Sequence, residues 1–363
     1  MVVSLDFHKE IARNIFSWYK GKKLRPVKLQ LNPTNMCNLK CPFCWLRDFP
    51  DLKYDDEVSG GRYEELIKEA KKLGIKEIQI TGGGEPLMRK DLLNIMKTIK
   101  EHGIVGKLTT NGTLFNKRMV EAIVEMGWDE IVFSLDGPNE KINDMHRGVN
   151  GAFKASIEWI KCFLSSRKKD KPKLSIHMVL TSKNFEVLSE MFEFVHKLGL
   201  NNLSIEPIVL LATRTRSGEE FLFREEHTRR LMYSLEKAKL ISRKYGFQSN
   251  VERLNVEMIK STKNMKKVIE KQESPHELLS LMCYEPWYHI VIRPNGFVGP
   301  CCMFDRSPEN IKEKSLNDVW FGEYFTKIRE TISNKHLLPF CSKCNPSQVI
   351  DNIRIRECLQ KMV

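Results

Sequence analysis

The sequence predicts an α/β fold in which six parallel strands and their connecting helices curl into an open, partial (β/α)6 barrel. Three observations support this: short β-rich runs alternate with helix-period segments over residues 27–210, glycines stand where helices should end, and polar motifs follow the strands. Right-handed crossovers would place the carboxyl ends of all the strands at one edge. Ligands bind beyond that edge, so the loops that follow the strands should carry the function.

The expected strands are six apolar runs at residues 27–31, 75–80, 105–108, 130–135, 174–180 and 203–209. Helix-period segments such as 63–73 and 117–126 separate them. Gly74, Gly103, Gly127 and Gly199 each close an amphipathic segment and precede a strand. This position suits a left-handed helix C-cap, so each glycine should mark a helix-to-strand turn.

Three further regions flank the barrel at residues 27–210. Residues 1–26 should hold an amphipathic helix over 5–20, which we expect to dock on the protein rather than on a membrane surface. Residues 211–282 form a connector of polar helices rich in Lys and Glu, and residues 283–363 form a small Cys-rich domain. A chain of 363 residues is long enough for this organisation, at about 150 residues per domain.

Composition excludes several classes of protein. Apolar residues make up 41% of the chain and charged residues 29%, which is typical of a globular protein and not of a disordered or fibrous one. No segment offers the roughly 20 apolar residues of a membrane span, and residues 1–28 contain no signal-peptide hydrophobic region or cleavage site, so we expect a cytoplasmic protein. The net charge of +13 is spread over basic runs at 20–28, 167–173 and 260–271. We interpret these runs as solvated faces, with RNA as the less favoured partner.

The chain has ten cysteines, which should be reduced thiols in the cytoplasm, so their clustering points to metal. Cys37, Cys41 and Cys44 lie within eight residues, with no histidine nearby to complete a four-ligand zinc site. On an iron–sulfur cluster, three thiolates leave one iron open to an outside ligand. Cys162 stands alone in an apolar stretch and should be a buried small hydrophobe.

The segments CNLKCPFC, TGGGEP, TTNGT and SLDG stand at the ends of successive predicted strands, and at these intervals they resemble the radical S-adenosylmethionine (SAM) superfamily over residues 27–210. The resemblance implies a TIM-like partial barrel and a four-iron, four-sulfur cluster on Cys37, Cys41 and Cys44. It also implies that SAM chelates the fourth iron, that Phe43 shields the cluster, and that reductive cleavage of SAM yields a 5′-deoxyadenosyl radical.

The same resemblance assigns residues to SAM. Gly82, Gly83, Gly84 and Glu85 match the motif that engages the methionyl ammonium, since glycines permit close approach and the carboxylate supplies a counter-charge. Ser134 stands where a polar contact to SAM is expected, and Arg147, in Asp144-x2-Arg147, where a contact to the carboxylate is expected. Arg147 could instead belong to a solvated face, and Asn111 could serve SAM or only its own turn.

The C-terminal cysteines follow the pattern Cys283-x12-Gly296-x4-Cys301 and then Cys341-x2-Cys344, which resembles the SPASM/Twitch extension. Residues 290–298 should form a β-hairpin that turns at Asn295-Gly296 and brings Cys283 close to Cys301. The resemblance implies an auxiliary iron–sulfur cluster, most simply four-iron, four-sulfur, although four thiolates would also suit zinc. A full SPASM domain would continue with further closely spaced cysteines, but residues 346–357 contain none, so we expect one auxiliary cluster and not two. Cys302 could exchange with Cys301 as a ligand, and Cys358 is expected to be a buried helix cysteine.

The resemblance implies a radical SAM enzyme that abstracts hydrogen from its substrate and whose auxiliary cluster either accepts an electron or positions the substrate. Peptide or protein modification is the first interpretation, although it is weakened because no leader-binding domain is apparent in the fewer than 30 residues before the first strand. The alternatives are a small-molecule dehydrogenase of the alcohol or aminosugar type, an RNA- or lipid-modifying enzyme, and a non-catalytic iron–sulfur or nucleic-acid-binding protein.

Two further expectations concern the catalytic acid or base and the protein that donates electrons to the enzyme. Glu206 ends the sixth strand and is a candidate catalytic acid or base, or else a buried, hydrogen-bonded carboxylate. By resemblance, a low-potential ferredoxin or flavodoxin would be the electron donor.

Overall fold

The computed structural model describes residues 5–48, 56–210, 218–270, 274–304 and 307–363. Its centre is a sheet of nine strands in the order β7-β6-β5-β4-β3-β2-β1-β8-β9, which does not close. All neighbouring strands are parallel except β8 and β9, which are antiparallel. The strands are β1 (Lys28–Leu31), β2 (Glu77–Ile80), β3 (Val105–Thr110), β4 (Glu130–Ser134), β5 (Lys173–Leu180), β6 (Asn202–Pro207), β7 (Gln248–Ser249), β8 (His289–Ile292) and β9 (Val298–Gly299).

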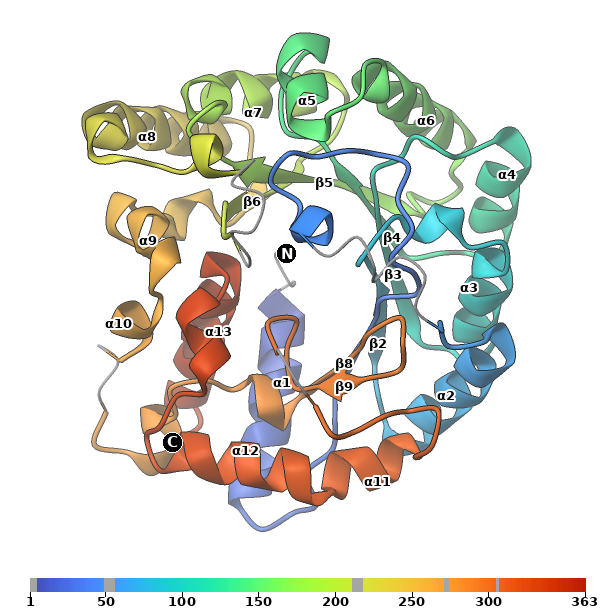
Figure 1. The fold of residues 1–363 in the computed structure, drawn as a ribbon, viewed down its shortest axis with the longest axis vertical. Helices are drawn as coiled ribbons and strands as arrows, with labels where there is room; N and C mark the ends of the chain where they lie inside the picture. Colours follow the sequence, from blue (N-terminus) through green and yellow to red (C-terminus); the bar gives the residue numbers. More distant parts are fainter. Residues whose placement is uncertain (1–4, 49–55, 211–217, 271–273, 305–306) are drawn as a thin grey trace.

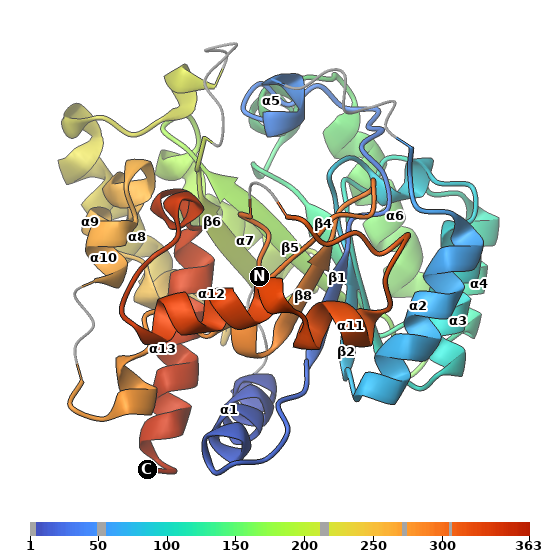
Figure 2. The same ribbon diagram turned by 60° about the horizontal axis from the view of Figure 1, so that its bottom comes forward.

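Helices surround this sheet as an outer ring, and α13 lies beside the gap that the sheet leaves open (Figure 1). The loops after the strands gather at one end of the sheet, where the segment that follows β1 lies beside α5 (Figure 2). The helices are α1 (Leu5–Tyr19), α2 (Gly60–Leu73), α3 (Leu92–Glu101), α4 (Lys117–Glu125), α5 (Glu140–Arg147), α6 (Ala152–Ser166), α7 (Leu188–Lys197), α8 (Thr228–Lys244), α9 (Val256–Lys260), α10 (Lys266–Ile269), α11 (Leu316–Phe321), α12 (Glu323–Ser333) and α13 (Pro346–Gln360).

The predicted open barrel is confirmed, and the sheet extends beyond the six expected strands. β7 comes from the connector, and β8 and β9 come from the Cys-rich region. β8 pairs with β1 in parallel, with Lys28 opposite His289, so one continuous sheet crosses the expected boundary at residue 283. β8 and β9 form the expected hairpin, in which Gly296 takes a φ of 89°. The four predicted C-cap glycines also have positive φ, as at Gly74 with 89°.

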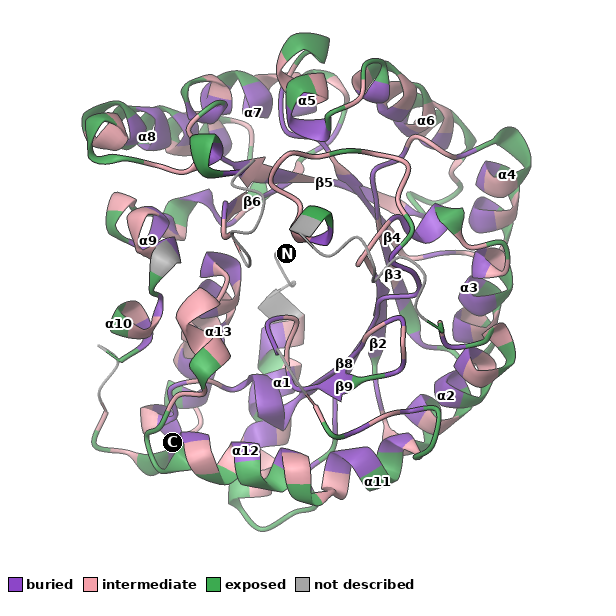
Figure 3. Ribbon diagram, viewed as in Figure 1, coloured by how far each residue is buried: buried purple, intermediate pink, exposed green. Residues whose placement is uncertain are grey.

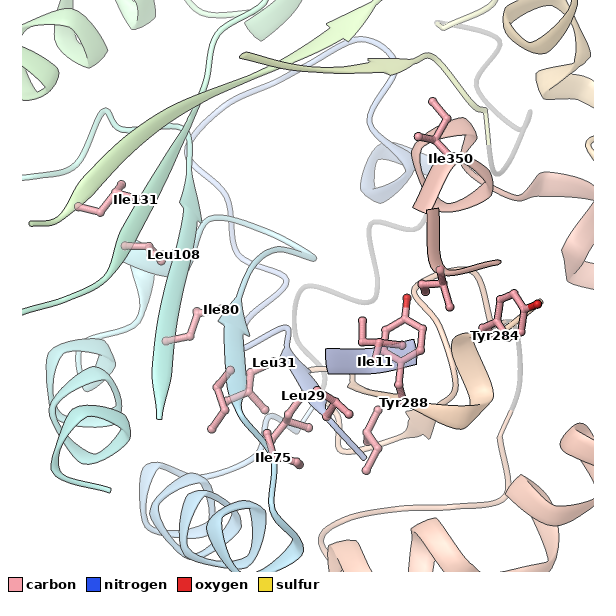
Figure 4. Close-up of a cluster of buried hydrophobic side chains, with 14 of the residues drawn as sticks. Ile11, Leu29, Leu31, Ile75, Ile80, Leu108, Ile131, Tyr284, Tyr288 and Ile350 are labelled. Atoms are coloured by element: carbon pink, nitrogen blue, oxygen red, sulfur yellow. The ribbon is translucent and has the colours of Figure 1, made fainter. Parts of the chain in front are cut away.

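The two faces of the sheet differ in polarity. Outward-facing residues pack against the helices, and Figure 4 shows part of this core, including Leu29, Ile80 and Leu108. The alternate residues of the same strands face the barrel interior and are often polar. Figure 3 shows that the strands are largely buried while exposed residues collect on the outer helices. The interior is therefore a polar chamber rather than the apolar filling usual in closed (β/α) barrels.

An ion triad of one buried and two partly buried side chains lies in the interior near the amino ends of three strands. Lys107 Nζ lies 2.8 Å from Glu77 Oε2 and 3.4 Å from Glu130 Oε2. Ser175 Oγ donates to the other oxygen of Glu130 at 2.6 Å. The two carboxylates raise the pKa of Lys107 despite its burial, so the triad holds the lysine charged.

Helix α1 docks on the protein, as expected from its apolar face. Ile11 and Ile15 are buried, and His8 Nε2 lies 3.0 Å from Asp351 Oδ1 of α13. The first and last helices of the chain therefore pack together. None of the helices that the structure describes is long and apolar enough to span a membrane.

Candidate active site

The loop after β1 carries the first cysteine cluster and is fixed by the neighbouring loops. The Lys40 N–H donates to the carbonyl of Arg147 at 3.1 Å, and Cys44 N–H donates to the carbonyl of Cys41 at 3.1 Å. Asn111 Nδ2 donates to Asn38 Oδ1 at 2.9 Å. The cysteine loop is therefore tied both to the end of α5 and to the loop after β3.

The glycine segment after β2 lies directly against the residues that precede Cys37. Gly84 N–H donates to the carbonyl of Thr34 at 2.7 Å, and Glu85 N–H donates to the carbonyl of Met36 at 2.7 Å. A Cβ on Gly84 would lie 2.0 Å from the Met36 oxygen, and one on Gly83 would lie 2.1 Å from Asn35 Oδ1. Only glycine permits this close approach between the two loops.

The carboxylate of Glu85 is buried and accepts hydrogen bonds from three donors. Leu87 N–H and Thr110 Oγ donate to Oε1 at 3.1 and 2.6 Å, and Asn111 N–H donates to Oε2 at 2.7 Å. Burial raises the pKa of Glu85, and these hydrogen bonds oppose the increase. Glu85 thus joins the glycine segment to the end of β3, and its contact with SAM stays a prediction.

Arg147 lies behind the cysteine loop and is nearly buried. Its Nη2 lies 2.9 Å from Oδ2 of Asp136, a fully buried carboxylate. Burial acts to lower the pKa of Arg147, but Asp136 and the thiol of Cys41 raise it. Its Nε has no hydrogen-bond partner among the residues that the structure describes. A buried cation with a spare donor beside the cysteines suits an incoming carboxylate, and the solvated-face interpretation does not fit this burial.

Asn111 serves its own turn as well as the cysteine loop. Its Oδ1 accepts from Thr113 N–H at 2.9 Å and from Thr113 Oγ at 2.7 Å, while its amide holds Asn38. Ser134 ends β4 opposite His177 and lies on the inner face of the sheet. Phe43 packs edge-on to Phe221 and His146, with ring centroids 5.3 and 5.9 Å apart, so aromatic rings cover the cysteine loop on this side.

The three thiols of the loop lie within electrostatic reach of one another. Burial raises the pKa of Cys44 to about 12, and the neighbouring Cys41 and Cys37 contribute to the increase. No three His, Cys, Asp or Glu side chains in the described ranges sit close enough to ligate one ion together. A four-iron cluster takes each thiolate on a separate iron, so spaced soft thiols in one loop fit a cluster better than a single metal ion.

The four predicted auxiliary cysteines come together from three segments of the chain. Burial raises the pKa of Cys301, and Cys283 and Cys344 raise it further. Cys341 similarly raises the pKa of Cys283 and of Cys344. These couplings indicate that the four thiols lie in one region, and four soft thiolates are a donor set that a cluster would neutralise.

The two remaining cysteines of this region differ in their surroundings. The Cys302 thiol lies 3.7 Å from the Asn345 amide and also raises the pKa of both Cys301 and Cys344. Cys358 is 8% exposed within α13 and belongs to the hydrophobic core, which confirms the buried helix cysteine. Cys162 of α6 is half-buried and packs against the same core.

One cavity of about 400 Å³ opens between the two groups of cysteines. Its walls are lined by Gln30, Asn32, Asn35, Cys41, Phe43, Cys44, Trp45, Gly82, Arg147, Val179, Glu206, Pro207, Ile208, Val209, Arg293, Pro294, Asn295, Cys302, Met303 and Asn345. Residues of the first cysteine loop therefore face residues of the Cys-rich region across one space. The cavity unites Arg147, Phe43, Gly82 and Glu206 of the predicted site, whereas Asn111, Ser134 and Glu85 do not line it.

Glu206 is a buried carboxylate at the wall of this cavity. It accepts hydrogen bonds from the backbone N–H of Ser347, at 3.3 Å, and from the Ser347 hydroxyl. Ser347 lies in the first turn of α13, so the carboxylate also faces the amino end of that helix. Burial raises the pKa of Glu206, and the bonds from Ser347 lower it.

Sequence reasoning missed Asp136, Arg293 and Asn345. Asp136 stands in the SLDG segment, but its pairing with Arg147 needed the positions of α5 and β4. Arg293 follows β8 directly and lines the cavity because β8 is part of the barrel sheet. Val179 also lines the cavity and was not predicted to do so. Strand periodicity places it on the inner face of the sheet, as it does the predicted Glu206, so the sequence did contain a signal for Val179.

Comparison with known proteins agrees with this architecture. Residues 31–195 match the model of the radical SAM superfamily, and residues 283–345 match SPASM, an iron–sulfur cluster-binding domain. The chain is 27% identical to Fe-coproporphyrin III synthase of Methanosarcina barkeri, over 96% of this chain and 87% of that protein. It is also 27% identical to the AdoMet-dependent heme synthase of the same organism, over 88% of each chain.

Among solved structures, SuiB of Streptococcus suis bound to the precursor peptide SuiA has a TM-score of 0.67 at 22% identity, over 87% of this chain and 70% of that one. This likeness shows the fold.

The fold, the two cysteine groups and these matches define an enzyme that uses SAM and iron–sulfur clusters. Residues 31–195 form a radical SAM domain, and residues 283–345 form a SPASM domain. The enzyme's cofactors are therefore SAM, a four-iron, four-sulfur cluster and auxiliary iron–sulfur; that there is one auxiliary cluster stays a prediction.

Proposed function

We propose that this enzyme oxidises a small group of a larger substrate, which enters the cavity between the two cysteine groups. The observation that supports it is the shared cavity, whose wall includes Cys41 and Cys44 on one side and Cys302 on the other. A substrate in this space would contact both regions at once. That arrangement suits removal of a hydrogen atom at one side and of an electron at the other.

When bound at Cys37, Cys41 and Cys44, the cluster and SAM supply the 5′-deoxyadenosyl radical that abstracts hydrogen. The chain's own residues position the reaction. Arg147 would hold the carboxylate of SAM with its spare Nε, and the buried Asp136 keeps the guanidinium in place. The glycine segment and Glu85 would hold the methionyl ammonium through the loop they shape.

Glu206 would accept the proton that an oxidation releases. Its carboxylate lines the cavity, and burial raises its pKa, which makes the carboxylate a stronger base than an exposed one. Ser347 holds the side chain in one orientation. The auxiliary cluster on Cys283, Cys301, Cys341 and Cys344 would accept the electron, in preference to a role in substrate positioning.

A peptide or protein side chain is the substrate class that we propose first. A cavity of about 400 Å³ lies near the small end of the range for ligand sites, and SAM must share it. We expect only a single side chain to enter, with the rest of the peptide outside. The structural neighbour SuiB holds its precursor peptide on the same fold.

A carboxylate-bearing tetrapyrrole is the second candidate, because the whole-length relatives include an Fe-coproporphyrin III synthase and a heme synthase. Here too only one side chain of the substrate would need to reach the cavity. Small-molecule dehydrogenation and RNA or lipid modification remain outcomes of the test, whereas the radical SAM domain argues against a non-catalytic protein.

The test uses anaerobically reconstituted enzyme, SAM and reductant, mixed with fractions of extract from cells grown in heavy water. Deuterium in 5′-deoxyadenosine reports abstraction from a molecule in that fraction. Label from the large-mass fraction that protease abolishes supports a peptide or protein substrate. Label from a small-mass, protease-resistant fraction contradicts it, and label obtained with deuterated Fe-coproporphyrin III supports the tetrapyrrole.

Two variants serve as controls in this assay. The triple Cys37/Cys41/Cys44→Ala protein should form no 5′-deoxyadenosine with any fraction. Glu206→Gln should still release labelled 5′-deoxyadenosine but form less oxidised product, because only the proton acceptor is lost. Equal loss of both products in Glu206→Gln would contradict the assignment of Glu206.

A further inference from the structure

A second cavity, of about 510 Å³, lies apart from the candidate active site. One wall is a face of α12, and the other is the end of α1 with the segment that leads to β1; Figure 2 shows α12 above α1. No residue lines both this cavity and the one between the two cysteine groups. We call it the α1–α12 cavity, and the lining residues that matter for its chemistry are Trp18, Lys22, Lys23, Leu24, Phe321 and Arg329.

Positive charge predominates in the α1–α12 cavity. Its wall carries three cations, Lys22, Lys23 and Arg329, and among the described residues Glu330 is the one carboxylate that lines it. Lys23 Nζ lies 4.3 Å from the centroid of the Phe321 ring, so this ammonium group is held at the wall. Both lysines belong to the basic run at 20–28, which the sequence alone presents as a solvated face. The structure instead brings them to one cavity with a buried arginine.

Arg329 is a partly buried cation that no carboxylate in the described part of the chain contacts. Its Nε donates to the carbonyl of Pro286 at 2.9 Å, and Nη1 and Nη2 both donate to the carbonyl of Trp320 at 3.1 Å. Burial lowers its pKa to about 10, whereas Arg62 and Arg89 lie 2.8 and 2.7 Å from a carboxylate oxygen. Each terminal nitrogen of Arg329 carries a second N–H, so its guanidinium can still bind an anion that enters the cavity.

Aromatic and apolar side chains form another part of the wall. Trp18 and Phe321 present ring surfaces, and the Trp18 ring is held edge-on to Trp287 with centroids 5.7 Å apart. Trp320 Nε1 donates to the carbonyl of Leu24 at 3.3 Å, which fixes the two walls to each other. A cavity of this volume falls within the range of small-molecule sites. Clustered cations beside aromatic rings suit a ligand that joins phosphate groups to a flat ring.

We propose that the α1–α12 cavity binds a nucleoside phosphate, with its phosphates against Lys22, Lys23 and Arg329 and its base against the aromatic side chains. The phosphates supply the negative charge that the wall lacks, and the base covers the apolar surface. This site lies apart from the residues assigned to SAM, so the inference does not depend on the proposed function.

Binding is measured with reconstituted enzyme and a fluorescent ATP analogue, whose anisotropy gives the affinity. Saturating S-adenosylhomocysteine is present throughout, so that the analogue cannot occupy the SAM site. Lys22→Gln/Lys23→Gln should weaken binding roughly 10-fold or more at low salt and less at high salt. The matched control Lys71→Gln/Lys72→Gln also removes two consecutive exposed lysines, at the end of α2, which line neither cavity. It should change the affinity less than about 2-fold, because distant surface charges are screened.

Competition then identifies the ligand. Unlabelled ATP should displace the analogue at lower concentration than tripolyphosphate or adenosine, because each of these lacks one part of the ligand. Equal displacement by tripolyphosphate, or tighter binding of a short single-stranded RNA than of ATP, would overturn the nucleoside phosphate. Equal effects of the two double variants, or no effect of either, would overturn the site. The lysine variants carry the test because Arg329→Met would also leave the Pro286 and Trp320 carbonyls without a donor.

Discussion

Replacing Gly84 with alanine should disable the first cysteine loop without touching any cysteine. The new Cβ would lie 2.0 Å from the Met36 oxygen and 2.7 Å from the Asn35 carbonyl carbon, and both contacts are to backbone that cannot rotate away. The two loops must therefore separate, and the hydrogen bonds from Gly84 to Thr34 and from Glu85 to Met36, each 2.7 Å, would break. The loss of these two hydrogen bonds, with their polar groups left unsatisfied, should lower the free energy of unfolding by about 2–6 kcal/mol in total.

The position of Gly84 adds a functional loss to this cost. Met36 immediately precedes Cys37, so a shifted loop should lose the cluster that needs three correctly placed thiolates. We expect the iron content of reconstituted Gly84→Ala to fall by roughly half, because the auxiliary cysteines are untouched. Calorimetry should then detect no SAM binding, and the urea midpoint should decrease.

Gly61→Ala is the matched control. Gly61 lies in α2, and a Cβ there would meet nothing within 4 Å. The substitution should leave iron and SAM binding unchanged and raise the stability by about 0.5–1 kcal/mol, because alanine favours the helix. A Gly84→Ala protein with the wild-type midpoint, iron content and SAM affinity would refute the close-approach argument.

Three further predictions concern residues outside the glycine segment. Lys107→Met should cost about 3–5 kcal/mol in urea unfolding, because it leaves the buried carboxylate of Glu77 and the partly buried one of Glu130 without a cation; adding Glu→Gln at both should recover most of the loss, and no recovery would argue against the triad. Cys358→Ser should retain full auxiliary iron by colorimetric assay, since this side chain lies in the core of α13; a loss matching that of Cys344→Ser would make it a ligand. Burial lowers the pKa of His177 from 6.5 to about 3. Between these two pH values the imidazole is therefore protonated in the unfolded chain and neutral in the folded protein. Its stability contribution is full above pH 6.5 and is lost as the pH falls toward 3; the free energy of unfolding should drop between pH 7.5 and 5.5, and less so in His177→Gln.

Local patterns were enough to predict the first six strands, the glycine caps and the hairpin at Asn295-Gly296, because each depends on residues close in sequence. The place of β8 beside β1 was not predictable in this way. Its apolar run is as compatible with a separate domain as with a barrel strand, and only the register between Lys28 and His289 distinguishes the two.

The candidate site likewise contains some features that depend on residues close in sequence and others that depend on contacts between distant elements. The cysteine spacings and the glycine segment are visible in the sequence, since each reads as one short motif. The pairing of Arg147 with Asp136 and the contact of Glu206 with Ser347 join elements far apart in the chain. The burial of Arg147 is what distinguishes a site residue from one on a solvated face. The sequence of this eight-residue helix does not show that the arginine is buried.

The pairing of β1 with β8 has a consequence for how the chain is made. β1 leaves the ribosome early, but the strand that covers its free edge follows only after most of the chain has been synthesised. Until then β1 presents unpaired backbone groups, which can join the edge of another chain. α1 must likewise wait for α13, so the barrel cannot be completed before the last helix emerges. Chains cut short before residue 289 should therefore aggregate, and the nascent protein should depend on chaperones or on rapid completion of synthesis.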